Sequence, residues 1–167
     1  KVLDLIPPGS RVLDLGCGYG WHCGYAASQG AAKAVGIDLS DKMLAVAREK
    51  NSAPGVEYRQ GSIEEAAFEA DSFDVAISSL ALHYVAEFAG VCRRVYAALT
   101  GGGEFVFSVE HPIFTAYGTQ DWLYGPDGEK LCWPVDRYFA EGRRDAVFLG
   151  EAVEKEHHTL TTYLGGV

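Results

Sequence analysis

The sequence predicts a doubly wound α/β fold, in which helices cover both faces of a mostly parallel sheet. Over the first 110 residues, short apolar runs alternate with segments of helical periodicity, which is the pattern of consecutive strand–helix–strand units. Runs such as 34–37 and 75–77 are apolar throughout, as expected for strands covered on both faces. The chain has 167 residues, 48% of them hydrophobic and 22% charged, which suits one domain with a sizeable core.

Turn and capping residues divide this region into five strands and three helices. Ser40 is a good N-cap for the second helix, the segment 51–55 breaks the chain after it, and the glycines at 101–103 end the third helix. The expected strands are 11–17, 34–39, 56–60, 73–79 and 104–109, and the expected helices are 21–29, 41–51 and 86–99.

The pattern loosens after residue 110. We expect a single domain over 1–167, with a core at 1–110, an insert or lid at 111–156 that faces a substrate, and the start of a C-terminal helix at 157–167. The acidic stretch 151–160 has a helical pattern. Several aromatic residues in this part either wall a hydrophobic substrate pocket or form a local core, and both interpretations stay open: Tyr117, Trp122, Tyr124, Trp133 and Phe139.

Composition excludes several classes of function. The net charge of −9 disfavours binding to nucleic acid. No apolar run approaches the roughly 20 residues that a membrane helix needs. The four cysteines form no C-x-x-C pair and the chain opens without a secretory signal, which favours a reduced, cytoplasmic protein. Lys1 in place of Met suggests a fragment that lacks an N-terminal helix.

A glycine-rich loop is the most specific feature. Asp14-Leu15-Gly16-Cys17-Gly18-Tyr19-Gly20 follows a predicted strand and precedes a helix, so its glycines let the backbone turn sharply and approach a ligand. Trp21 stands where the dinucleotide fingerprint requires its third glycine, and no Lys follows as a phosphate-binding loop requires. Asp38, at the end of the second strand, is placed to accept hydrogen bonds from ribose hydroxyls.

These segments resemble motifs of the class I S-adenosylmethionine-dependent methyltransferases. Residues 12–20 resemble the first motif, 36–40 with Met43-Leu44 the second, 73–84 the fourth-strand motif and 101–108 the fifth-strand motif. The nearest subgroup is the small-molecule type akin to the ubiquinone/menaquinone-biosynthesis methyltransferases. The resemblance implies a Rossmann-like fold and methyl transfer from S-adenosylmethionine to a small molecule by in-line displacement. It also implies seven strands, so the last strands are expected to be missing from this chain.

The resemblance assigns a role to each matching position. It implies that Asp14 lies near the methionine amino group, that Gly16 and Gly18 allow the chain to pass close to the cofactor, and that Asp38 binds the ribose. The other implied contacts are with adenine, from Leu39, Met43, Ser62 and Ile63, and with the methionine side, from Ser79 and Leu80. Members of the family often carry Asp in place of Ser62, and Glu64 is a candidate to compensate for that difference.

His83 and His111 are the candidate catalytic residues. Each follows a strand at the carboxyl edge of the sheet, where an imidazole could act as a general base. A packing or capping role for His83 and a loop role for His111 stay open.

We predict no metal. His157 and His158 are adjacent on an expected helix and do not face each other, so a solvated face is expected there, and His22-Cys23 lacks a third ligand. Two other functions also remain open: an inactive or regulatory relative that binds S-adenosylmethionine, and a nucleotide-cofactor oxidoreductase. The acceptor and the oligomeric state are not predicted.

Overall fold

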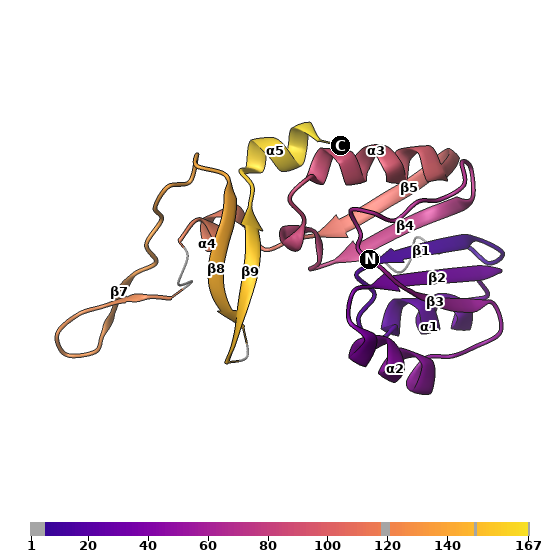
Figure 1. The fold of residues 1–167 in the computed structure, drawn as a ribbon, viewed down its shortest axis with the longest axis horizontal. Helices are drawn as coiled ribbons and strands as arrows, with labels where there is room; N and C mark the ends of the chain where they lie inside the picture. The colour runs from indigo at the N-terminus through magenta and orange to yellow at the C-terminus, as the bar shows by residue number, and fades with distance from the viewer. Residues whose placement is uncertain (1–5, 118–120, 149, 167) are drawn as a thin grey trace.

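A five-stranded parallel sheet forms the centre of the molecule, as the sequence predicts (Figure 1). The computed structural model describes residues 6–117, 121–148 and 150–166, so Lys1 lies outside the described residues. The strand order is β3-β2-β1-β4-β5. The strands are β1 (Arg11–Leu15), β2 (Lys33–Asp38), β3 (Val56–Gln60), β4 (Phe73–Ser79) and β5 (Leu99–Ser108).

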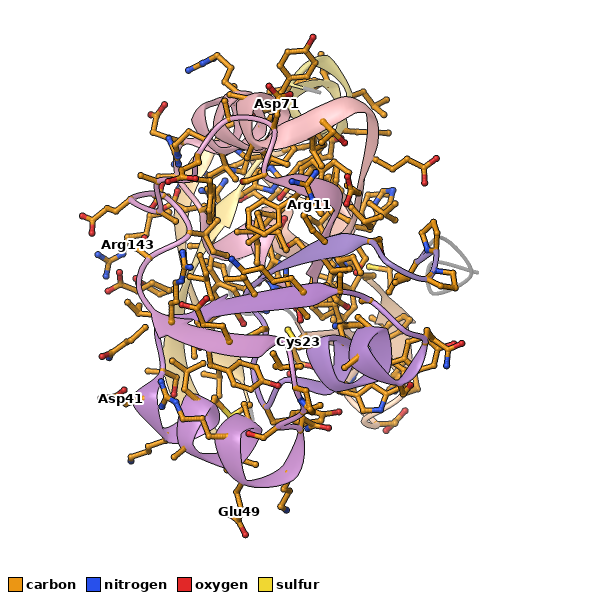
Figure 2. All side chains as sticks on the ribbon, turned by 90° about the vertical axis from the view of Figure 1, so that its right-hand side faces the viewer. Arg11, Cys23, Asp41, Glu49, Asp71 and Arg143 are labelled. Carbon is orange, nitrogen blue, oxygen red and sulfur yellow. The ribbon has the colours of Figure 1, made fainter. Side chains whose placement is uncertain are left out.

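Helices cover both faces of this sheet. The α1 (Trp21–Ser28) and α2 (Asp41–Lys50) helices lie on one face, and α3 (Phe88–Ala98) and α5 (Leu160–Gly165) lie on the other (Figure 1). Because side chains alternate along a strand, Val12 packs in the cluster with α1 and α2 whereas Leu13 packs in the cluster with α3. In Figure 2 the sulfur of Cys23 lies between the sheet and α1, while Asp41 and Glu49 point outward from α2.

The strand order reverses between β1 and β4, which marks a crevice at the carboxyl edge of the sheet. In open α/β sheets ligands bind at such a reversal. The loop after β1 carries the glycines, and a short 3₁₀ helix, η2 (Leu82–Tyr84), follows β4 on the same edge.

The predicted elements of the core match the structure to within two residues at most ends. The exception is β5, which begins at Leu99 and not at residue 104, so the three glycines lie inside the strand and do not separate it from α3. Extended backbone that pairs with β4 from Phe73 onward explains this difference.

The C-terminal part holds α4 (Pro112–Ala116) and two antiparallel hairpins, β6–β7 (Leu123–Tyr124 and Lys130–Cys132) and β8–β9 (Gly142–Phe148 and Glu151–His157). The prediction of a helix over 151–160 is wrong, because residues 151–157 pair with β8 as the strand β9. Figure 1 shows the β8–β9 hairpin beyond the carboxyl ends of the sheet strands, and it adds no strand to that sheet. Within the expected C-terminal helical stretch 157–167, His157 ends β9 and the helix α5 begins at Leu160.

Two of the five aromatic residues singled out in the insert, Trp122 and Trp133, form a small cluster with Phe114. Trp133 stacks on Phe114 with ring centroids 4.8 Å apart, and Trp122 packs edge-on against Trp133 at 5.5 Å. Tyr124 and Phe139 are exposed. The local cluster is therefore supported for Trp122 and Trp133 alone, and none of the five residues is among those that line the cavity described below. Among the described residues, no helix has the length and apolar character that crossing a membrane requires.

Candidate functional site

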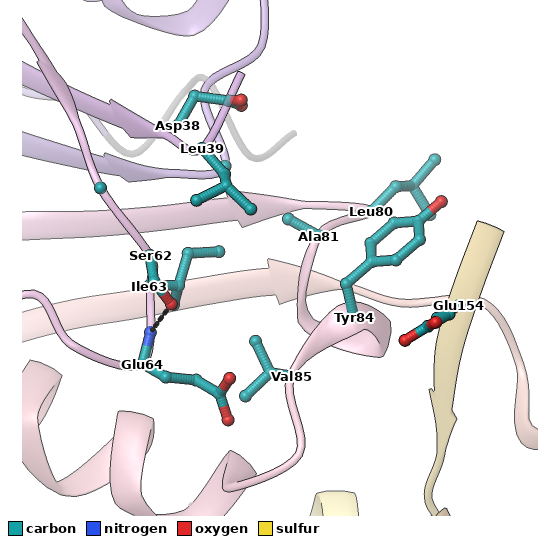
Figure 3. Close-up of a pocket in the computed structure, with 12 residues that line it drawn as sticks. Asp38, Leu39, Ser62, Ile63, Glu64, Leu80, Ala81, Tyr84, Val85 and Glu154 are labelled. Atoms are coloured by element: carbon teal, nitrogen blue, oxygen red, sulfur yellow. Dashed lines mark hydrogen bonds between the residues drawn. The ribbon is translucent and has the colours of Figure 1, made fainter. Parts of the chain in front are cut away.

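A cavity of about 500 Å³ lies at the carboxyl edge of the sheet, between the strand ends and the β8–β9 hairpin (Figure 3). Its wall comes from loops after β1, β2, β3 and β4, together with one residue of β9. The lining residues are Gly16, Asp38, Leu39, Gly61, Ser62, Ile63, Glu64, Leu80, Ala81, Tyr84, Val85 and Glu154. Six of the ten candidate cofactor residues are therefore brought to one place from four separate segments.

The glycine loop forms the floor of the cavity where it meets β2 and η2. Gly16 has a φ of 73°, and a Cβ at this position would overlap the side chain of Ala81. Its N–H donates to the Ile37 carbonyl at 2.8 Å, which fixes the loop against the end of β2. Any larger residue at Gly16 would push the loop and η2 apart and change the floor of the cavity.

Asp38 is half-buried and holds two loops at once. Its Oδ2 accepts a hydrogen bond from the Gly18 N–H at 2.8 Å, and its Oδ1 accepts one from the Ser40 N–H at 2.8 Å. A carboxylate has about four acceptor positions, so each oxygen keeps capacity for a ligand in the cavity. Ser40 caps α2 by accepting from the Met43 N–H at 3.3 Å, so Asp38 is not needed for that bond.

Leu39 and Ile63 line the same cavity, and Leu39 is 72% exposed. The Ser62 hydroxyl accepts a hydrogen bond from the Glu64 N–H at 3.1 Å (Figure 3). The Glu64 carboxylate accepts from the N–H groups of Ala86 and Glu87, the two residues before α3. Glu64 thus lines the cavity while it fixes the start of α3.

Met43 lies outside the set of lining residues but close to the loop. Its Cε would contact a Cβ placed on Gly18 at 3.4 Å, so the Met43 side chain packs beside that glycine. Met43 is 38% exposed.

Asp14 lies beneath the glycine loop, fully buried, and one of its oxygens lacks a partner. Oδ1 has no hydrogen bond among the described residues, whereas Oδ2 lies 3.6 Å from His22 Nδ1 and 3.8 Å from Cys23 Sγ. Burial raises the pKa of Asp14, and the contact with Asp14 raises the pKa of His22. An unpaired buried carboxylate oxygen is costly, so a ligand that donates to it would be stabilised.

Leu80 lines the cavity in a strained conformation that the sequence does not reveal. Its φ is 53°, in the left-handed region that a non-glycine residue seldom adopts. Its N–H donates to the Ser108 carbonyl at 2.9 Å, and its side chain is 56% exposed. Ser79, directly before it, is exposed at the end of β4, with its hydroxyl 3.4 Å from that of Ser108. The bonds to β5 hold this bend at the edge of the cavity.

His83 does not line the cavity, and its environment disfavours a role as a base. It is 2% exposed, and its Nδ1 accepts from the Glu110 N–H at 3.4 Å. Burial lowers the pKa of His83 to about 4, although the nearby Glu110 carboxylate raises it. The imidazole is therefore a weak base at neutral pH, and of the two interpretations the packing role fits better.

His111 lies in a different cavity, against Phe107, Pro112 and Tyr163. Its Nδ1 accepts a hydrogen bond from the Ile113 N–H at 3.2 Å, so the side chain caps α4. The lone pair that a base would use is occupied, and the structure thus separates both candidate bases from the cavity.

His157 and His158 are buried, which corrects the expectation of a solvated face. The His157 Nε2–H donates to the Tyr138 carbonyl at 2.8 Å, so its Nδ1 accepts from the Thr115 hydroxyl at 2.8 Å. The His158 Nε2–H donates to the Val85 carbonyl at 2.7 Å. Both histidines tie the hairpin and α5 to the rest of the fold. In the part of the chain that the structure describes, no group of three or more His, Cys, Asp or Glu side chains is arranged to hold a metal ion.

Sequence reasoning missed Tyr84 and Glu154, which both line the cavity on the side away from Ser62 (Figure 3). Burial, and to a lesser degree the Glu110 carboxylate, raises the pKa of Tyr84. Tyr84 directly follows His83, so the sequence already places it at the carboxyl edge of the sheet, and this position could have identified it as a candidate. Glu154 lies on a segment that was expected to be helical, and nothing in its local sequence indicates that it reaches the cavity.

Comparisons with known proteins match this arrangement. Residues 13–107, from β1 to β5, match the family model described as a methyltransferase domain. A crystal structure provisionally named as an S-adenosylmethionine-dependent methyltransferase from Listeria monocytogenes is 53% identical, with a TM-score of 0.92 over 99% of this chain and 78% of its own. An S-adenosylmethionine-dependent methyltransferase from Mesorhizobium loti is 44% identical, with a TM-score of 0.86 over 96% of this chain and 73% of its own.

A curated relative matches a shorter part of the chain. The ubiquinone biosynthesis O-methyltransferase of Hahella chejuensis is 40% identical over 60% of this chain, and the chain spans 43% of that relative's length. The two crystal structures, by contrast, match almost all of this chain, including the insert after residue 110. The insert with its hairpins is therefore shared with some proteins of this fold.

Proposed function

The chain belongs to the methyltransferase domain family, and we propose that it transfers a methyl group from S-adenosylmethionine to a small-molecule acceptor in the cavity at the carboxyl edge of the sheet. One observation carries the proposal: six candidate cofactor residues from the loops after β1, β2, β3 and β4 line a single cavity. A turn or a helix cap would account for any one of them, but not for their convergence.

The residues present fit the cofactor. Asp38 keeps acceptor capacity for the two ribose hydroxyls beyond its bonds to Gly18 and Ser40. The apolar side chains of Leu39 and Ile63 line the cavity as the two sides of a slot for the adenine ring would. The Oδ1 atom of Asp14 has no hydrogen-bond partner in the described residues, so it can accept a hydrogen bond from the amino group of the methionine part of the cofactor.

The remaining candidates support the same placement. Ser62 lies at the rim beside Ile63, where its hydroxyl can meet the adenine edge. Met43 packs beside Gly18, and Ser79 and Leu80 lie at the end of β4, on the side assigned to the methionine part.

Bound S-adenosylmethionine supplies an activated methyl group, so the protein's task is to bind, orient and exclude water. Eleven of the twelve lining residues come from 1–110, and Glu154 comes from 111–156. This supports the proposal that residues 1–110 hold the cofactor and that residues 111–156 face the acceptor. With His83 and His111 outside the cavity, we assign neither as a base.

Substitution of Asp38 tests the proposal. Asp38→Ala should weaken S-adenosylmethionine binding, measured by calorimetry, by at least tenfold, about 1.4 kcal/mol, because paired ribose contacts are lost. Asp38→Ala also loosens the start of α2, because the Ser40 N–H loses its acceptor. Ser40→Ala is the control for this effect, because it removes the side-chain cap of α2 without changing a residue that lines the cavity. Unchanged affinity in Asp38→Ala, or an equal loss in Ser40→Ala, would contradict the assignment.

A further inference from the structure

On the side of the insert, the cavity is lined by a carboxylate and a phenol. Glu154 comes from β9 and Tyr84 from η2, and Figure 3 shows both side chains on the side of the cavity away from Ser62. Tyr84 is 42% exposed, and its ring also packs beside that of His83 with centroids 4.5 Å apart, so part of its surface is accessible to a ligand. Neither residue is needed for the cofactor contacts described above.

The charged side chains that line the cavity are all acidic. Three carboxylates line the cavity, from Asp38, Glu64 and Glu154, and no Lys, Arg or His is among the lining residues. Asp38 and Glu64 are engaged with backbone N–H groups of the loops that they hold. Glu154 is the carboxylate that does not hold a loop, and it lies on the insert.

Glu154 does pair with Arg143 on β8, but the pair is open to exchange. Arg143 Nη2 contacts Glu154 Oε1 and also Asp145 Oδ1, so one guanidinium serves two carboxylates and the three side chains together carry a net charge of −1. The Arg143 and Glu154 side chains are 59% and 63% exposed. Ion pairs with such exposure contribute little to stability, so a ligand cation can replace or share this contact at small cost.

A buried ion pair fixes the strand that carries Glu154. The neighbouring Lys155 is 1% exposed, and its Nζ donates to both Glu110 carboxylate oxygens, at 2.7 and 2.8 Å. Glu110 lies just beyond β5, so this pair ties β9 to the carboxyl edge of the sheet. Glu154 is thus held at the cavity by a rigid element.

We propose that Glu154 binds an amino group of the methyl acceptor, and that the acceptor is an amine. The inference rests on the proposed function, because it assigns the substrate class of the same cavity. A protonated amine donates a charge-assisted hydrogen bond to the Glu154 carboxylate and can lie over the Tyr84 ring. Transfer of one proton from the ammonium to Glu154 would give the nitrogen the lone pair that forms the new N–C bond, and the electron pair of the broken S–C bond would stay on sulfur. An anionic acceptor would meet three carboxylates with no cationic side chain among the lining residues, so like charges would oppose its entry. The apolar lining from Leu80 and Val85 suits a hydrocarbon part on the same molecule.

The test compares isosteric probes in the complex with S-adenosylhomocysteine. Benzylamine, benzyl alcohol and benzoate are titrated by calorimetry into the full chain saturated with S-adenosylhomocysteine. We expect benzylamine to bind at least tenfold more tightly than benzoate, with benzyl alcohol between them. Glu154→Gln should abolish this preference while S-adenosylhomocysteine affinity stays unchanged. Asp145→Asn, which alters the other carboxylate on Arg143 outside the cavity, should preserve the preference.

The outcomes separate the two proposals. Equal affinity for the three probes, including no detectable binding of any of them, overturns the amine assignment, and so does a preference that persists in Glu154→Gln. If the wild-type chain does not bind S-adenosylhomocysteine, the proposed function fails instead. Loss of cofactor affinity in Glu154→Gln would show that Glu154 belongs to the cofactor half of the cavity and would also overturn the inference.

Discussion

His83 lies directly after η2 begins, at the edge of the sheet where a base would reach the cavity, yet its imidazole packs inside the protein at 2% exposure. Its ring lies 4.5 Å from that of Tyr84, and the Tyr84 side chain, one residue later, lines the cavity instead. A shift of one residue in a 3₁₀ turn therefore decides which side chain meets the ligand. Sequence spacing places both residues at the edge of the sheet but does not determine which of them faces the cavity.

The burial of His83 predicts a measurable pH dependence. Because burial lowers the folded-state pKa to about 4, below the ordinary value of 6.5, the unfolded chain takes up this proton first. The contribution of His83 to the free energy of unfolding is therefore fully present above pH 6.5 and is lost as the pH falls toward 4. NMR titration of the ring should show a neutral imidazole from pH 6 to 8. A midpoint at or above 6.5 would contradict the buried placement.

The cofactor half of the site was more predictable from sequence than the acceptor half. Asp38, Gly16 and Leu80 lie beside glycines or strand ends in one continuous stretch of βαβ units, so their positions follow from topology. Glu154 reaches the cavity by tertiary packing of a hairpin that follows the core in the chain, and no local pattern encodes that contact. The left-handed backbone of Leu80 was equally invisible, because a leucine carries no signal for it.

At the scale of elements, the core strands and helices were predicted because hydrophobic periodicity and turn residues agree there. The mistaken helix over 151–160 has a physical explanation. Its Glu, Lys and Ala residues favour a helix in isolation, but pairing with β8 and burial of Lys155 and His157 favour a strand. Burial of a lysine cannot be anticipated without its partner, Glu110, 45 residues earlier.

We predict that the buried ion pair between Lys155 and Glu110 stabilises the β8–β9 hairpin. Lys155→Met should lower the free energy of unfolding by about 3 to 5 kcal/mol, because it leaves the Glu110 carboxylate without its main partner in a partly buried site. Chemical denaturation measures the loss, and hydrogen exchange should show it first in β9.

The matched comparison is the double variant Lys155→Met with Glu110→Gln, which removes both charges and should recover part of the stability. Arg143→Met, which removes the exposed pair on the same hairpin, should cost less than about 1 kcal/mol. A similar small loss in Lys155→Met would contradict the anchoring role of the buried pair.

At the scale of the whole molecule, the cavity lies between a core shared by many proteins of the family and an insert shared with some of them. The family model ends at residue 107, whereas the structures from Listeria monocytogenes and Mesorhizobium loti match nearly the full chain. The insert supplies Glu154 to the lining of the cavity.

A crystal structure of the chain with S-adenosylhomocysteine tests the central claim most directly. We predict the ribose hydroxyls within hydrogen-bonding distance of Asp38, the adenine between Leu39 and Ile63, and the sulfur directed toward Leu80 and Tyr84. A nucleoside bound outside the cavity, or an Asp38 carboxylate without contact to the ribose, would contradict the claim.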